Sequence, residues 1–294
     1  MKNFLKKNYI MIIVVAACLV GSALLLYPSI ASWWNERHQS RAIATYQEAV
    51  EDLTDEEYEA ALEEAREYNE WLYETDHGLG LTDEELEEYE SILNINGDGI
   101  IGYVEIPVID VYLPIYHTTE DSVLAVGLGH LEGSSFPVGG ENTHAVITGH
   151  TGLPSAELFT NLSLLEEGDI FYVYVLDEMY TYEVEEIFTV MPDEIDELDI
   201  FEGEDYVTLL TCTPYGLNTN RLLVRGTRIE NPTEEELKES EAVKDRSFPN
   251  RDDIAAIIAL AVLAGLVVLL VVQIIKAIRN RRIRKGKAKP KETS

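Results

Sequence analysis

The sequence predicts a mostly β fold, in which a closed or nearly closed, mostly antiparallel barrel follows an acidic helical segment and lies between two transmembrane helices. From Ile100 onward, short runs of alternating or β-branched residues are separated by Gly, Pro and Asp, with no helix-length segments between them. Before residue 95, the chain is acidic and has helical periodicity. Two charge-free apolar segments, 10–27 and 254–275, are each about long enough to cross a ~30 Å hydrocarbon core.

The charges that flank the apolar segments predict their orientation. Lys2, Lys6 and Lys7 precede the first segment, and nine Lys or Arg residues follow the second, between 276 and 291. Positively charged flanks stay in the cytoplasm. We therefore expect a cell-membrane protein with a cytoplasmic N-terminus (1–9), a basic cytoplasmic tail (276–294) and an extracellular middle. An alternative for 10–27 is a cleaved signal peptide, with "SIA" at 29–31 as the cleavage site.

The charge of the part between the two apolar segments argues against nucleic-acid partners. The formal net charge is −32, from 22 basic and 54 acidic residues. Twelve of the basic residues, but only one acidic residue, lie in the two tails. The extracellular part is therefore strongly acidic, which argues against DNA or RNA as a partner because phosphate binding needs a basic face.

The segment 32–95 predicts two helices with a lid-like loop between them. Thr54 with Glu57, and Thr82 with Glu85, have the Thr-x-x-Glu spacing of a capping box. "DHGLG" at 76–80 separates the two helices.

The segment "NINGDGIIGYVE", residues 94–105, nearly matches an EF-hand calcium loop. However, its first position is Asn94 rather than Asp, and it leads into a Pro-containing strand instead of a helix. We interpret it as a turn before the first strand, and we predict no metal and no cofactor.

Residues 96–230 form the predicted barrel domain, and 231–252 form a polar tether to the second apolar segment. Seven strand-like runs support this assignment: "IIGYVEIP", "VYLPIY", "HAVITGH", "DIFYVYVLD", "YTYEVEEIFTVM", "YVTLLTCT" and "RLLVRGTRI".

Cys212 is the only cysteine outside the apolar segments, since the other one is Cys18. A disulfide within the extracellular part of one chain is therefore excluded. Three interpretations remain: an inert buried thiol, an intermolecular disulfide, or a nucleophile. A nucleophile needs a base or a cation nearby to favour the thiolate.

Both groups are available at the ends of strand-like runs. His150 ends "AVITGH", and Arg221 begins a strand nine residues after Cys212. In an antiparallel pair with a loop of that length, Cys212 and Arg221 lie at the same end of adjacent strands. Among the other histidines, we interpret His144 as structural, whereas His130 either packs in the core or lines a groove.

These segments resemble the sortases. "TLLTCTPYGLNTNRLLVRG" resembles the Thr-Leu-x-Thr-Cys strand and strand-leading Arg of that family, and "HAVITGHTGLPSAELF" resembles its histidine segment. "GHLEGSSFPVGG" at 129–140, "CTPYG" and the C-terminal apolar segment are more similar to the pilin-polymerising class C branch than to the housekeeping branch. The resemblance implies a closed eight-stranded barrel and a cysteine transpeptidase.

The resemblance also implies roles and partners. Cys212 would be the nucleophile, His150 the general acid and base, and Arg221 the clamp for the oxyanion. The substrate would be a pilin or surface protein with an LPXTG-like sorting signal, cleaved between Thr and Gly. The amine that accepts the acyl group would be a pilin lysine. We list Thr211, Tyr215 and His130 as groove candidates.

The lid departs from the family pattern, because no Asp-Pro-aromatic triplet occurs before the barrel. Asp76 and His77, or Trp71 as an aromatic plug, are the candidate replacements. With two glycines and few large apolar residues after Trp71 and Tyr73, we expect a weakly anchored lid that opens at small free-energy cost.

Two other functions stay open. One is a housekeeping sortase that anchors surface proteins to peptidoglycan with the same chemistry. The other is of a different class: a catalytically silent barrel adhesin, or a cysteine hydrolase of the NlpC/P60 kind. NlpC/P60 sequences place Cys before His, whereas here Cys212 follows His150.

Overall fold

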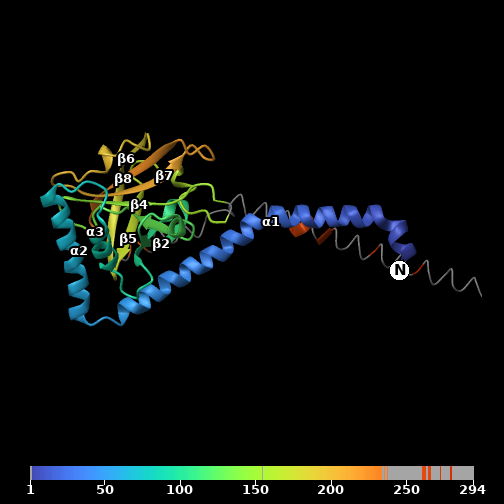
Figure 1. Ribbon diagram of the computed structural model, residues 1–294, viewed down its shortest axis with the longest axis horizontal. Coiled ribbons are helices and arrows are strands. Elements are labelled where there is room, and N and C mark those ends of the chain that lie inside the picture. Colours follow the sequence, from blue (N-terminus) through green and yellow to red (C-terminus); the bar gives the residue numbers. More distant parts are fainter. Residues whose placement is uncertain are drawn as a thin grey trace, which may run out of the picture. The chain divides into compact units, whose positions relative to one another are not determined.

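A computed structural model describes residues 2–153 and 155–233 and scattered positions up to 279 (Figure 1). The chain divides into two compact units, one formed by residues 1–30 with 248–294 and the other by residues 31–247. Each unit is considered by itself.

Helix α1 (Lys2–Glu51) includes the first apolar segment. In the described part of the chain, no helix is both long and apolar enough to span a membrane, so the predicted transmembrane helix at 10–27 is not supported there. Most of the predicted helix at 254–275 lies outside the described residues.

Two capped helices follow α1, as predicted. Helix α2 (Asp55–Thr75) begins after Thr54, and helix α3 (Asp83–Ser91) begins after Thr82. In both, the Thr hydroxyl accepts from the backbone of the Glu three residues later, whose carboxylate accepts from the Thr backbone N–H. Helix α2 ends at Asp76, which adopts the left-handed conformation typical of a helix C-terminus.

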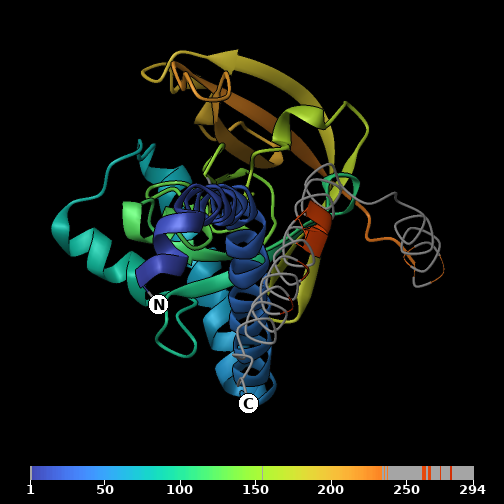
Figure 2. The same ribbon diagram turned by 90° about the vertical axis from the view of Figure 1, so that its right-hand side faces the viewer.

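Eight strands close into the predicted barrel, in the order β1-β2-β3-β4-β7-β8-β6-β5. Their bounds are β1 Ile100–Ile106, β2 Val111–His117, β3 Leu128–His130, β4 Thr143–Thr148, β5 Ile170–Val175, β6 Glu178–Val190, β7 Asp205–Thr213 and β8 Asn220–Ile229. Figure 2 shows the long strands β6, in yellow, and β7 and β8, in orange, which are neighbours in the sheet. Short helices lie in the connections: α4 (Asp121–Leu124) and the 3-10 helices η1 (Pro107–Ile109), η2 (Leu162–Leu164) and η3 (Asp196–Leu198).

The barrel is mostly antiparallel, as predicted, but two of its pairings are parallel. Strand β2 runs parallel to β3, and β4 runs parallel to β7. A parallel pair needs a long connection. Here the chain between β4 and β7 includes η2, β5, β6 and η3. The parallel pairing places the C-terminal ends of β4 and β7 at the same rim of the barrel.

Buried polar contacts attach the helices to the barrel. The Tyr46 hydroxyl of α1 donates to the Ile101 carbonyl at 3.0 Å and accepts from the Leu176 N–H at 2.7 Å. The Asn69 amide of α2 is bonded to both the N–H and the carbonyl of Phe136. These bonds satisfy polar groups inside an otherwise apolar core and fix the helices relative to the strands.

The EF-hand-like segment forms the predicted turn into β1. Its side chains bond to the turn itself: Asn94 Oδ1 accepts from the Gly99 N–H, and Asp98 Oδ1 accepts from the Ile100 N–H, both at 3.0 Å. The described residues contain no group of three or more His, Cys, Asp or Glu side chains placed to hold a metal ion.

Candidate active site

Cys212 and Arg221 lie directly opposite each other on adjacent antiparallel strands. The register of β7 and β8 pairs Cys212 with Arg221, one step from the end of the ladder. The β-branched residues in "YVTLLTCT" favour the strand that ends at this position. Both side chains are half-buried, so they are held by the sheet and still reach solvent.

His150 reaches the same place through the parallel pair β4 and β7. Their register pairs Thr148 with Leu210. Thr148 lies two residues before His150, and Leu210 lies two residues before Cys212. Beyond the ladder, the Gly149 N–H donates to the Leu210 carbonyl at 3.0 Å, and the Thr211 hydroxyl donates to the Gly149 carbonyl at 2.7 Å. The segment that carries His150 therefore stays attached to β7 as far as the cysteine.

Glycine is required at position 149 for this attachment. A Cβ atom there would lie 2.6 Å from Leu128 Cδ2 and 2.8 Å from the ring of Phe159. Such contacts are shorter than van der Waals distances, so a side chain at position 149 would require Leu128 and Phe159 to shift.

One cavity of about 360 Å³ contains all three predicted catalytic residues, His150, Cys212 and Arg221. This volume lies in the range of small-molecule and peptide-side-chain pockets. Apolar residues of the barrel face and of the connection between β6 and β7 form most of the wall: Leu131, Leu210, Leu223, Pro192, Ile195 and Leu198. A thiol, an imidazole and a guanidinium thus share one mainly apolar cavity, where electrostatic interactions are stronger than in water.

The loop after α2 reaches the same cavity with Leu79. Leu79 lines the cavity wall and packs against the apolar cluster formed by Val146, Leu198 and Leu223. Sequence reasoning missed this residue. The available signal was a leucine between two glycines, Gly78 and Gly80.

The three predicted lid residues lie at the base of this loop, which is better anchored than we expected. The His77 ring packs against Trp71 at a tilt of 41°, with centroids 4.6 Å apart, and its Nε2 lies 3.5 Å from Glu85 Oε1. The His77 N–H also donates to the Leu72 carbonyl at 3.0 Å. Asp76 is exposed and does not line the cavity that holds Arg221 and His150.

The predicted groove residues do not line the cavity. His130 is fully buried, stacked on Phe136 and bonded to the Ser135 carbonyl at 2.8 Å. Burial lowers its pKa to about 3, so it is a neutral core residue. Thr211 is buried and supports Gly149 instead. Tyr215 is 69% exposed, on the loop after Cys212. None of the three lines this cavity, and His130 adopts the core alternative that the sequence left open.

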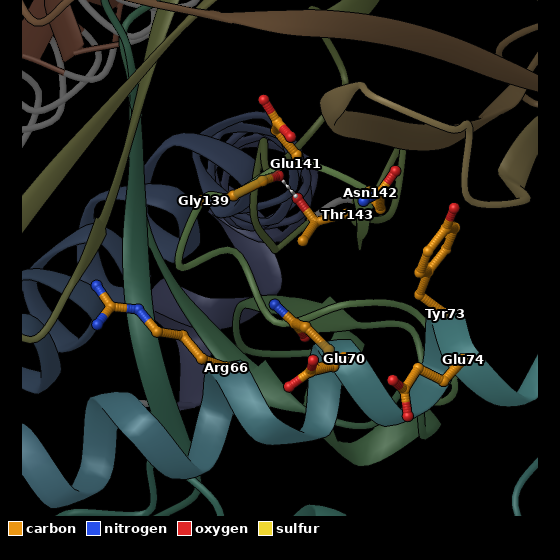
Figure 3. Close-up of a pocket in the computed structure, with 10 residues that line it drawn as sticks. Arg66, Glu70, Tyr73, Glu74, Gly139, Glu141, Asn142 and Thr143 are labelled. Atoms are coloured by element: carbon orange, nitrogen blue, oxygen red, sulfur yellow. Dashed lines mark hydrogen bonds between the residues drawn. The ribbon is translucent and has the colours of Figure 1, made fainter.

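A second cavity, of about 390 Å³, lies away from this site, between α2 and the loop before β4 (Figure 3). Arg66, Glu70 and Glu74 of α2 face Glu141 and Thr143 across it. It contains no thiol, histidine or lysine and lies at the N-terminal end of β4, at the opposite end of that strand from His150. It therefore lacks the thiol and the imidazole of the candidate site.

Comparisons with known proteins agree with this geometry. A model of the sortase domain matches residues 104–229, from β1 to the last residue of β8. The crystal structure of sortase C1 from Streptococcus agalactiae is 47% identical and has a TM-score of 0.64, with coverage of 65% of this chain and 100% of that one. Sortase C from Clostridium perfringens, solved with the C-terminal cell wall sorting motif, is 45% identical, with a TM-score of 0.58 and coverage of 65% and 100%.

The similarity to a curated relative covers a smaller part of this chain than the similarity to the solved structures. Sortase A of Streptococcus agalactiae serotype III (strain NEM316) is 31% identical over 117 residues, which are 39% of this chain and 47% of that protein. The chain spans about half the length of these curated relatives. The solved sortase C structures are matched over their whole length at more than 40% identity, and the range matched by the sortase model contains His150, Cys212 and Arg221. The chain therefore belongs to the sortase family.

Proposed function

We propose that this protein is a membrane-anchored cysteine transpeptidase that cleaves an LPXTG-like sorting signal between Thr and Gly and joins it to a pilin lysine. The observation that carries this proposal is the single cavity shared by His150, Cys212 and Arg221 at adjacent strand ends. A catalytically silent adhesin would not need this constellation in a partly exposed cavity.

The residue types supply each step of an acyl transfer. The Cys212 thiolate attacks the threonine carbonyl carbon, and Arg221 stabilises the negative charge that develops on the oxygen. The C–N bond then breaks, and His150 gives its proton to the leaving glycine amine. This leaves a thioester on Cys212. The amine of the acceptor attacks that thioester, loses a proton to His150 and forms an amide bond as the thiolate leaves.

The class of substrate is supported by the cavity and by the relatives. Its mainly apolar wall suits the aliphatic and proline side chains at the start of such a signal. A structure of the Clostridium perfringens relative was solved with a cell wall sorting motif, and a sortase C from Streptococcus pneumoniae, 44% identical, was described for its pilin substrate specificity. These similarities favour pilus assembly for this chain.

Anchoring of surface proteins to peptidoglycan is the second candidate function. It is favoured by the 31% identity to a sortase A. The acyl-enzyme would be the same, and only the acceptor amine would differ.

The proposed location follows from the sequence. The charge-free segments 10–27 and 254–275 would anchor the chain, with basic residues on their cytoplasmic sides. The acidic barrel would then lie outside the cell, where sorting signals are presented.

The direct test is detection of the thioester. Incubation of the full-length chain with an LPXTG peptide should add the mass of the acyl fragment, as measured by intact-mass spectrometry after acid quenching. Cys212→Ala should lose the adduct completely, whereas Cys18→Ala, which removes the only other thiol, should keep it. An adduct that persists in Cys212→Ala would refute the assignment of the nucleophile.

The acceptor is tested in the same assay. A lysine-containing pilin peptide should release the acyl fragment as an isopeptide product faster than a peptidoglycan-precursor amine at the same concentration. The reverse order would favour the housekeeping function.

A further inference from the structure

A second histidine and a second arginine lie on the same face of the sheet as the candidate site. Side chains two residues apart on a strand share a face. His144 therefore shares the face of β4 that leads toward His150, and Arg225 shares the face of β8 that carries Arg221. Between them on β7, Thr208 pairs with Arg225 as Cys212 pairs with Arg221.

His144 connects this face to the segment between β6 and β7, residues 191–204. Its Nδ1 lies 2.7 Å from the Asp199 carbonyl, and its Nε2 lies 2.7 Å from the Thr208 hydroxyl. Because the carbonyl can only accept, Nδ1 donates to Asp199 and Nε2 accepts from Thr208. The imidazole thus joins the segment 191–204 to β7.

Arg225 also connects the sheet to the segment 191–204. Its guanidinium carbon lies 5.3 Å from the ring centre of Phe201 and 5.0 Å from that of Tyr206. It forms ion pairs with Glu197 of η3, at 3.4 Å, and with Glu186 of β6. The Arg225 side chain is only 11% exposed, so the contacts on the segment side, Glu197 and Phe201, are made by a fixed group.

The segment held in this way forms the outer wall of the active-site cavity. Pro192, Glu194, Ile195 and Leu198 all line the cavity that contains Cys212. Leu198 belongs to the same one-turn helix, η3, as Glu197. A displacement of η3 would therefore move a wall residue of the cavity while His150, Cys212 and Arg221 stayed on their strands.

We propose that His144 and Arg225 are positioning residues, here called the loop clamp, that hold residues 191–204 against the sheet and thereby determine how tightly the cavity binds the peptide substrate. This inference rests on the proposed function. Neither residue of the loop clamp lines the cavity. Its effect should therefore appear in substrate binding rather than in the chemical step.

A purely stabilising role would not need these groups. A buried ion pair is often no more stabilising than apolar residues of the same volume, because both charges lose their hydration. What the arginine adds is a planar fork that reaches two carboxylates and stacks on aromatic rings in one defined geometry.

The test compares Arg225→Lys with Arg228→Lys in the full-length chain. Arg228 is a matched control, since it is also on β8 and lies 5.3 Å from the Tyr180 ring and 5.7 Å from the Tyr182 ring, but bonds to the Thr181 carbonyl at the far end of β6. Arg225→Lys should speed amide hydrogen exchange in residues 191–204 and raise KM for the sorting peptide about tenfold, with kcat within about twofold. Arg228→Lys should change neither quantity.

Glu197→Gln provides a second variant that is safe for folding, because Glu197 is half-exposed and only its contact with the loop clamp is lost. It should reproduce the direction of both effects. Faster exchange with an unchanged KM would overturn the inference, and so would unchanged exchange in both variants. A wild-type chain that forms no thioester would count against the proposed function, and the exchange measurement would still decide whether the loop clamp holds the segment.

Discussion

Two regions of one sheet face carry nearly the same residues and differ in their environment. At the rim, His150, Cys212 and Arg221 are half-buried around a cavity, and no hydrogen bond joins any two of these side chains. Farther down the same strands, His144, Thr208 and Arg225 are buried; His144 is hydrogen-bonded to Thr208, and Arg225 is paired with Glu186 and Glu197. The comparison teaches that a histidine and an arginine beside a thiol or hydroxyl can act on a substrate only where their N–H groups and lone pairs are not already used in hydrogen bonds and ion pairs within the protein.

The pKa values follow the same division. Burial, together with a smaller contribution from the nearby Arg225 guanidinium, lowers the pKa of His144 to about 4. His144 is therefore neutral at physiological pH and cannot serve as an acid. Its role is to accept and donate fixed hydrogen bonds.

The largest expected difference between the two regions is in catalysis. His150→Gln should lower kcat for acyl transfer about 10³-fold, because general acid catalysis is lost, and should leave the melting temperature unchanged. His144→Gln should keep kcat within about tenfold and lower the melting temperature, because buried hydrogen bonds are lost. The measurements are peptide turnover and thermal unfolding; equal losses of kcat in the two variants would break the comparison.

Thiol labelling tests the role of exposure directly. In a Cys212→Ala background, Thr208→Cys places a thiol opposite Arg225, where the native side chain is fully buried. Its rate of alkylation by iodoacetamide should be about 100-fold lower than that of Cys212 in the wild type, because a reactive thiolate needs solvent access. Equal rates would show that the loop clamp region opens as readily as the cavity.

The third effect is on stability as the pH changes. The pKa values of His117, His130 and His144 are lowered mainly by burial, so the unfolded state binds more protons than the folded state. The free energy of unfolding should therefore fall as the pH drops below about 6.5 and continue to fall toward the folded-state value of about 4 for His144. Between pH 7 and pH 5, His144 alone should contribute a loss of about 2 kcal/mol, or about 5 °C in melting temperature.

Two variants check this assignment. His144→Gln should make the dependence of the melting temperature on pH shallower, whereas replacement of the exposed His38 by Gln should leave it unchanged. A slope that is unaffected by His144→Gln would assign the acid sensitivity to other groups.

The smallest effect concerns Leu79. Leu79→Ala should raise the rate of Cys212 alkylation severalfold but less than about tenfold, because one side chain leaves the cavity while the base of the loop stays anchored by His77. Asp76→Ala is the control and should have no effect, since Asp76 is exposed and away from the cavity. A rise of 100-fold in Asp76→Ala would show that this carboxylate closes the site.

Local patterns in the sequence predicted the elements and most of the candidate site. The capping boxes at Thr54 and Thr82 were confirmed, because each depends only on residues three positions apart. The pairing of Cys212 with Arg221 followed from an antiparallel hairpin in which Arg221 comes nine residues after Cys212. Leu79 and the contacts of Arg225 were not predictable, because their partners lie in other elements and only packing brings them together.

The sequence by itself thus determined the mostly antiparallel β architecture, the single thiol outside the apolar segments at a strand end and the arginine opposite it, since these depend on periodicity and on the spacing along the chain. The tertiary structure decided how the predicted histidine, His150, meets the thiol. His150 and His144 lie on one strand with the same side-chain parity, and 62 residues separate His150 from Cys212. The parallel register of β4 and β7 places His150 at the rim and His144 under the segment 191–204, and the solvent access that results gives the two imidazoles different roles.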